Sequence, residues 1–202
     1  MIEIIKDKDI YNHLTEYDAI LVGTNIYCTM SQGLQLQIML NKPYAFNKNL
    51  ETKYGDIEKL GTILECKEDN EPTICLCFIV KGYNFRPDLN KDYLSYESLE
   101  RCLKMVNILY KGKHIACPLL GCSRFDGNGD KDKVIQIFND TLTDVNITIY
   151  DYHQLSRSEM MKKTRETELA IKKQDRKKYY ETVAKRKQEA DERYKKNGHR
   201  RY

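Results

Sequence analysis

The sequence lacks the features that mark membrane and secreted proteins. In its 202 residues no apolar run approaches the roughly 18–20 residues that a membrane-spanning helix needs. The opening segment, MIEIIKDKDI, mixes acidic with apolar residues, so we expect no secretory signal. The seven cysteines are odd in number, and their spacings suggest no disulfide framework. We therefore expect a soluble, cytoplasmic protein with reduced thiols and no membrane partner.

Patterns of metal ligands are also missing. The four histidines are scattered along the chain, at His13, His114, His153 and His199. Cys75 and Cys77 form a pair with one residue between them, but no second pair or neighbouring histidine completes a zinc site. The sequence therefore predicts no metal site and no cofactor.

The charges divide the chain into two parts. The whole sequence has 34 Lys+Arg and 30 Asp+Glu, a net charge of +4. Residues 153–202 hold 17 basic and 8 acidic residues, a net charge of +9, whereas residues 1–152 hold 17 basic and 22 acidic residues, a net charge of −5. We predict an acidic body domain, residues 1–152, and a basic tail, residues 153–202.

The body alternates between strand and helix patterns. Apolar runs of strand length stand at Ile2–Ile5, Asp18–Thr24, Thr62–Cys66, Thr73–Val80, His114–Leu120 and Asn146–Tyr150. The third and fourth of these read as an antiparallel hairpin. Helical spacing begins at Ser31 and recurs over residues 95–110 and Lys131–Leu142. The predicted fold is an α/β sandwich around a mixed sheet.

Two details of these patterns are specific enough to check. Within residues 95–110, one helix face is expected to carry Leu99, Cys102, Leu103, Val106 and Leu109. Residues 41–60 are polar and contain Pro43 and Gly55, so they are expected to form a loop.

The tail predicts one long C-terminal helix. Ser156 and Glu159 form a capping box, and no Pro or Gly follows until Asn197-Gly198. The apolar stripe over residues 156–196 is thin: Leu169, Tyr180, Val183, Ala190 and Tyr194. Such a helix is either solvated or held by a protein partner, a second copy of the chain or a nucleic acid. The eight acidic residues of the tail weigh against nucleic acid.

Two turns between a strand and a helix are suited to anions. They are Asn25–Gly33 (NIYCTMSQG) and Gly121–Gly129 (GCSRFDGNG). In open α/β sheets ligands bind beyond the carboxyl ends of strands, where helix N-termini present backbone N–H groups to phosphate. Two such turns would suit a diphosphate, although most glycine-containing turns are only turns.

Three tracts of the body carry a resemblance to one known family. The run DAILVGTNIYCTMSQGLQLQI is similar to the first ligand loop of macro domains, and the middle tract given below resembles the branch that includes terminal ADP-ribose glycohydrolases and ADP-ribose 1″-phosphate phosphatases. The run IACPLLGCSRFDGNGDKDKVIQIFND, with ITIYDY after it, resembles the second loop, its helix and the last strand. The tract GTILECKEDNEPTICLCFIVKGYNFRP, followed by YESLERCL, resembles the middle. The resemblance covers residues 1–152 and implies a three-layer α/β/α sandwich that binds ADP-ribose.

The resemblance also implies roles for single residues. Asp9, or Asp7, matches an Asp that contacts adenine, and Asn25 matches a polar residue near the distal ribose. Lys81 matches a nucleophile that attacks the ribose anomeric carbon, and Asp126 an assisting carboxylate. The two ligand loops correspond to Met30, Ser31, Gln32 and Gly33, and to Gly121, Cys122, Ser123 and Arg124.

The sequence departs from the family pattern in both loops. Ser31 and Gln32 stand where glycine-like residues are usual, and so do Ser123 and Arg124, although Arg124 is suited to pair with a phosphate. Two hypotheses follow: an ADP-ribose-binding domain that hydrolyses ADP-ribosyl groups or ADP-ribose 1″-phosphate, or a non-catalytic structural protein. The second would act as an assembly component, for example of a bacteriophage virion, and dock through its tail helix.

Overall fold

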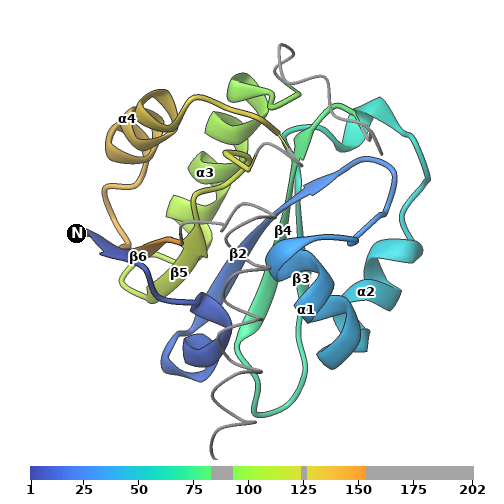
Figure 1. The fold of residues 1–202 in the computed structure, drawn as a ribbon, viewed down its shortest axis with the longest axis horizontal. Helices are drawn as coiled ribbons and strands as arrows, with labels where there is room; N and C mark the ends of the chain where they lie inside the picture. Colours follow the sequence, from blue (N-terminus) through green and yellow to red (C-terminus); the bar gives the residue numbers. More distant parts are fainter. Residues whose placement is uncertain (83–92, 124–126, 153–202) are drawn as a thin grey trace, which may run out of the picture. The chain divides into compact units, whose positions relative to one another are not determined.

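The body is built on one six-stranded mixed sheet. The computed structural model describes residues 1–82, 93–123 and 127–152. The strands are β1 (Ile2–Lys6), β2 (Ala19–Asn25), β3 (Ile63–Cys66), β4 (Thr73–Val80), β5 (His114–Pro118) and β6 (Asn146–Asp151). Their order in the sheet is β1-β6-β5-β2-β4-β3, and every neighbouring pair is parallel except β3 with β4 (Figure 1). This confirms the predicted mixed sheet and its hairpin.

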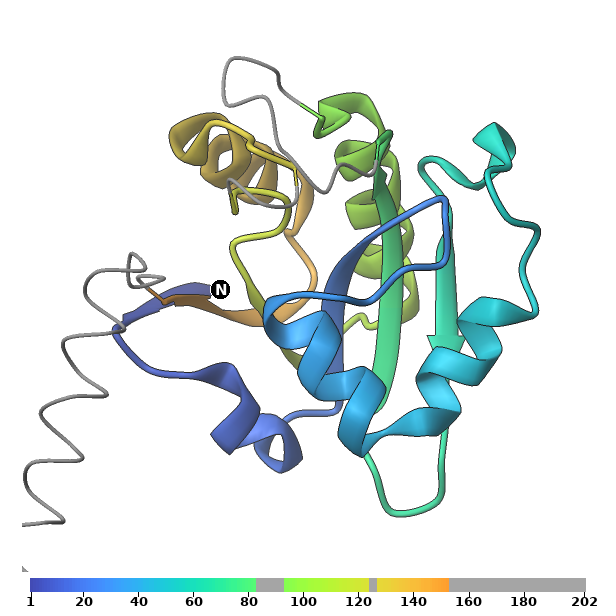
Figure 2. The same cartoon turned by 45° about the vertical axis from the view of Figure 1, so that its right-hand side comes forward.

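Helices cover both faces of the sheet. On one face lie α3 (Tyr96–Leu109) and α4 (Lys131–Thr141), and on the other lie α1 (Gly33–Asn41), α2 (Pro43–Leu50) and the 3-10 helix η1 (Ile10–Glu16) (Figures 1 and 2). A second 3-10 helix, η2 (Ile57–Lys59), precedes β3. The body is thus the predicted three-layer α/β/α sandwich.

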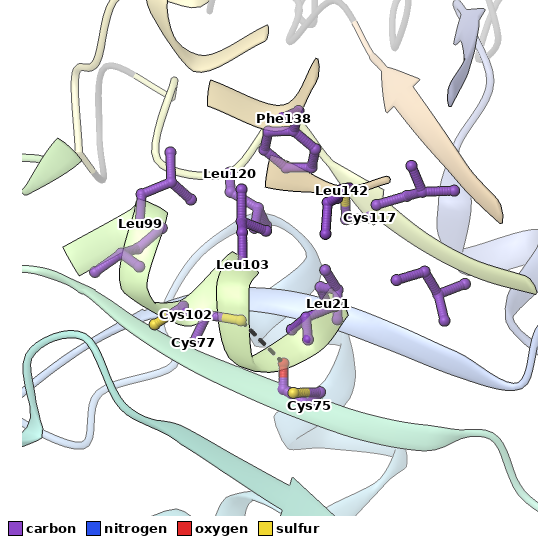
Figure 3. Packing of buried hydrophobic residues seen from close by; sticks show 14 of the residues in the cluster. Leu21, Cys75, Cys77, Leu99, Cys102, Leu103, Cys117, Leu120, Phe138 and Leu142 are labelled. Atoms are coloured by element: carbon purple, nitrogen blue, oxygen red, sulfur yellow. Dashed lines mark hydrogen bonds between the residues drawn. The ribbon is translucent and has the colours of Figure 1, made fainter. Parts of the chain in front are cut away.

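Strand β2 divides its side chains between two hydrophobic cores. Ala19 and Leu21 join the core under α3 and α4, where Leu99, Leu103 and Phe138 pack (Figure 3). Ile20 and Val22 join the core under α1 and α2, with Ile38 and Ala45. Successive strand residues point to opposite faces, so a continuous apolar run is what a strand covered on both sides requires. Each fully buried aliphatic side chain contributes roughly 1.5–3 kcal/mol to folding.

The apolar face of α3 differs from the prediction at its last turn. Leu99, Cys102, Leu103 and Val106 are buried as expected, but Leu109 is 54% exposed and Tyr110 is buried in its place. The helix ends at Leu109, and the position four residues after Val106 continues the buried face. The Tyr110 hydroxyl donates a hydrogen bond to Glu65 Oε1 at 2.7 Å.

The prediction of a loop over residues 41–60 is wrong. Pro43 stands at the first position of α2, where its missing N–H has no helical partner to lose. The proline therefore starts a helix, and η2 follows before β3. In the described ranges no helix is long and apolar enough to cross a membrane. The predicted tail helix, residues 156–196, lies outside the described residues.

Candidate functional site

A crevice is expected where the order of the sheet reverses. β2 and β5 pair only through Ala19 with Ile115 and Ile20 with Ala116, at their amino ends. From β5 the chain continues to β6 on one side, whereas β2 pairs with β4 on the other. Within the described residues the remainder of β2, from Leu21 to Asn25, has no β5 partner. In open α/β sheets ligands bind at such a reversal, beyond the carboxyl ends of the strands.

The structure brings the two predicted ligand loops to this edge. β1, β6, β5, β2 and β4 are all parallel, so the segments that follow them leave the sheet on one side. Gly23 of β2 passes close to the second loop, because a Cβ on Gly23 would lie 3.6 Å from Gly121 N and 3.0 Å from Ile79 Cδ1. A side chain at position 23 would therefore contact the start of the second loop and require the end of the Ile79 side chain to shift.

Asn25 shapes the first loop. It is buried, with 4% of its surface exposed. Its Nδ2 donates to Thr29 Oγ1 at 2.7 Å and to Thr29 O at 3.2 Å, and its Oδ1 accepts from Tyr27 N at 2.9 Å. The amide therefore closes an Asx-type turn that folds the loop back on the end of β2. Contact between Asn25 and a ribose stays a prediction.

Of the remaining predicted residues of the first loop, one is buried and three are exposed. Met30 is 1% exposed and packs in the core under α1, so only its backbone is placed to meet a ligand. Ser31, Gln32 and Gly33 are exposed. Gly33 has φ +52°, and a Cβ there would meet nothing within 4 Å. The loop thus opens to space at the start of α1.

The N-termini of α1 and α4 differ in what they offer an anion. At α4 the Asp130 carboxylate already accepts a hydrogen bond from Lys133 N at 2.8 Å. At α1 the N-cap residue is Gln32, whose side chain makes no capping hydrogen bond. The N–H groups of the first turn and the positive end of the helix dipole attract negative charge. The side-chain cap at the start of α4 therefore carries negative charge, whereas Gln32 at the start of α1 carries none.

The second loop is closed by its own glycines. Gly121 has φ +70°, and its carbonyl accepts from Gly129 N at 2.9 Å. A Cβ on Gly127 would lie 2.3 Å from Gly121 O, while Gly127 O accepts from Tyr93 N and Leu94 N at 2.8 and 2.9 Å. These glycines are required by the packing of the loop itself, without reference to a ligand.

The other predicted residues of the second loop are placed only in part. Cys122 and Ser123 are half-buried. The Cys122 thiol lies 3.7 Å from Leu120 O, and Ser123 O accepts from Asn128 N at 2.9 Å. Arg124 and Asp126 lie outside the described residues.

Lys81 follows the carboxyl end of β4, and Asp7 and Asp9 follow the carboxyl end of β1. Asn25 is in register with Val80, so Lys81 follows β4 directly beside the start of the first loop. The Lys81 side chain is exposed, and the backbone N–H of Lys81 donates to Tyr93 O at 3.0 Å. Asp9 is exposed and caps η1 by accepting from Tyr11 N at 3.0 Å. Asp7 is exposed and has φ +59°. Their predicted roles toward a ligand remain predictions.

Two side chains that no sequence pattern indicates form hydrogen bonds with the backbone of β2 and of the first loop. Gln35 Nε2 of α1 donates to Gly23 O at 2.6 Å, and Lys59 Nζ of η2 donates to Ile26 O at 2.9 Å. Both contacts join residues 12 or more positions apart, and no local motif in the sequence indicates them. In the ranges that the structure describes, no group of three His, Cys, Asp or Glu side chains is arranged to hold a metal ion.

Comparison with known proteins identifies the architecture. No protein-family model matches the sequence, and no curated protein matches it. Among solved structures, a protein of unknown function from Bacteroides thetaiotaomicron matches with a TM-score of 0.60 and 16% identity, over 75% of this chain and 98% of that one. The macrodomain of Thermus aquaticus DarG matches with a TM-score of 0.54 and 18% identity, over 75% and 98%.

A third structure was solved with a ligand. Thermosipho africanus DarTG in complex with ADP-ribose matches with a TM-score of 0.54 and 15% identity, over 77% of this chain and 43% of that one. At these identities the likeness shows a shared fold and no shared activity.

Proposed function

We propose that this chain, whose body has the macro-domain fold, binds ADP-ribose, with the diphosphate at the first loop and the N-terminus of α1. The observation that carries the proposal is the start of α1, which opens at the sheet reversal, carries no side-chain cap among the described residues and has open space above Gly33. A solved structure of the same fold is a complex with ADP-ribose.

The electrostatics of the crevice support this position. A diphosphate is strongly anionic, and backbone N–H groups at a helix N-terminus receive it without the cost of desolvating a side chain. The Asp130 carboxylate at α4 would repel the same group. The predicted pairing of Arg124 with a phosphate belongs to this proposal, as does the contact of Asp9 with adenine.

The finer proposal is that the domain releases bound ADP-ribosyl groups, with Lys81 as the nucleophile. Lys81 follows β4 beside Asn25, at the edge where the ligand is proposed to bind. Its exposed side chain is accessible to a sugar in the crevice. The alternative from the sequence, a non-catalytic structural protein, requires that neither binding nor turnover is measured.

Calorimetry with two variants at one position tests the binding proposal. Gln32→Asp places a carboxylate where the diphosphate is proposed to lie, and Asp is also a preferred N-cap residue. We expect the free energy of unfolding to rise by about 0.5–1 kcal/mol, while affinity for ADP-ribose falls by about tenfold or more. Gln32→Asn is the matched control, because it caps the helix without a charge and should keep the affinity.

The outcomes separate the possibilities. Equal affinity in Gln32→Asp and Gln32→Asn would place the diphosphate elsewhere. Absence of any heat with unmodified protein at high micromolar ADP-ribose would leave the structural-protein hypothesis.

A further inference from the structure

We propose that Cys28 and Lys59 form a site of reversible oxidative crosslinking, in which peroxide joins the cysteine sulfur to the lysine nitrogen. Lys59 Nζ lies 3.2 Å from Cys28 Sγ. Cys28 belongs to the first loop and Lys59 to η2, and 31 residues separate them in the chain. Neither side chain has a role in the proposed ligand site.

The lysine nitrogen is held against the sulfur by other contacts. Lys59 Nζ also donates to Thr52 Oγ1 at 2.7 Å and to Ile26 O at 2.9 Å. Thr52 Oγ1 also lies 3.3 Å from Cys28 Sγ, so this hydroxyl contacts both the sulfur and the lysine nitrogen. Two reactive groups fixed at contact distance have a high effective concentration toward each other.

The pair is reachable by a small oxidant. Cys28 is 5% exposed, but Lys59 and Thr52 are half-buried, so the cluster lies just under the surface. Five other cysteines, Cys66, Cys75, Cys77, Cys102 and Cys117, are buried at 0% exposure. Hydrogen bonds with Cys102 and Cys75, and then burial, raise the pKa of the Cys77 thiol well above its usual range. Burial does the same for the pKa of Cys117, so the reactive thiolate is disfavoured at both positions.

The chemistry proceeds in two balanced steps. Cys28 sulfur attacks one oxygen of hydrogen peroxide, the O–O bond breaks, and sulfenic acid and water form. The amine of Lys59, after losing its extra proton to solvent, then attacks the sulfur. The S–O bond breaks, water leaves, and a sulfenamide S–N bond remains. Sulfur is oxidised and peroxide is reduced to water, with a net loss of two hydrogen atoms from the protein.

Such a bond would tie the first loop to η2. Cys28 has φ +55°, a conformation that costs a non-glycine residue energy, and it lies three residues after Asn25. The crosslink would restrict the movement of the first loop, which leads into the start of α1. This consequence for ADP-ribose rests on the proposed function, whereas the crosslink itself does not.

Peptide mapping after peroxide treatment of the full chain tests the proposal. We expect a crosslinked pair of peptides containing Cys28 and Lys59, lighter than their sum by about 2 Da and separated again by dithiothreitol. Cys28→Ser should abolish the pair. Lys59→Arg keeps the cation that holds the loop but offers no amine, and should leave Cys28 as a sulfenic acid that a dimedone reagent captures. Lys59→Met provides a second variant without the amine.

Several results would overturn the proposal. They are a Cys28 that remains a thiol while the half-buried Cys122 is oxidised, a crosslinked pair that persists in Lys59→Arg, or a pair heavier than expected by one oxygen atom. Because the crosslink is read by mass, it is detected whether or not the chain binds ADP-ribose. Failure of the crosslink and failure of the proposed function are therefore distinguishable.

Discussion

The side-chain amides around β2 are used within the protein, and this decides what a ligand meets. Asn25 Nδ2 makes two hydrogen bonds to Thr29, and Gln35 Nε2 donates to Gly23 O. In the proposed site, recognition by the first loop would therefore fall mainly to backbone N–H groups near Ser31 and Gly33. Backbone donors fix the position of a phosphate but do not read the group attached to it, so the proposal assigns specificity to residues such as Lys81 and Asp9.

Replacing Lys81 tests the catalytic proposal. Lys81→Arg keeps the positive charge, but a guanidinium stays protonated and is a poor nucleophile. We expect release of ADP-ribose from an ADP-ribosylated protein to fall by about 100-fold or more, with ADP-ribose affinity changed less than about threefold. Lys67→Arg, at a lysine that is 66% exposed beside β3, is the matched control and should change neither quantity. Full turnover in Lys81→Arg would remove Lys81 from the chemistry.

The elements that the sequence predicts well are those whose pattern is local. Strand β2 and helix α3 follow from apolar spacing within a few residues, and the turn after β2 follows from its place between a strand and a helix. Helix α2 does not follow from such a pattern, because a proline interrupts helices in general and is compatible with one only at its start, where Pro43 stands. The contact of Lys59 with Cys28 depends on tertiary packing, which no short pattern encodes.

Asp18 links the starts of β2 and β5, where these strands have only two paired positions. Its Oδ2 accepts from His114 N at 2.9 Å, and Lys113 Nζ lies 3.4 Å from its Oδ1. The hydrogen bond from His114 N, and then Lys113, lower the pKa of the Asp18 carboxyl. A carboxyl whose folded pKa is below its unfolded value stabilises the fold above the unfolded pKa, near 4, and loses that stabilisation as pH falls through the folded pKa.

We expect Asp18→Asn to reduce the free energy of unfolding at pH 7 by about 0.5–1 kcal/mol, a figure discounted for solvent because the Asp18 side chain is 42% exposed. The deficit should shrink as pH is lowered below about 4, since the native carboxyl is then protonated too. Urea unfolding at pH 7 and at pH 3 measures both values. An equal deficit at the two pH values would show that the charge of Asp18 contributes nothing.

At the scale of the whole molecule, the body completes its own sheet and cores. β6, the last strand, lies between β1 and β5, so the N-terminal strand is paired only when the chain has reached residue 151. Among the described residues, both cores consist of residues between Ile2 and Tyr150. The composition of residues 153–202 predicts a helix that is either solvated or held by a protein partner, a second copy of the chain or a nucleic acid.

Truncation after residue 152 separates these two parts. We expect residues 1–152 to unfold in one cooperative transition, with a midpoint within about 5 °C of the full chain, because truncation keeps every described core residue. ADP-ribose affinity should stay within about twofold, since the proposed site uses only the body. Sedimentation of the two forms then tests whether the tail mediates self-association. Self-association that is lost on truncation depends on residues 153–202. A truncated chain that fails to fold would show that the tail completes a core.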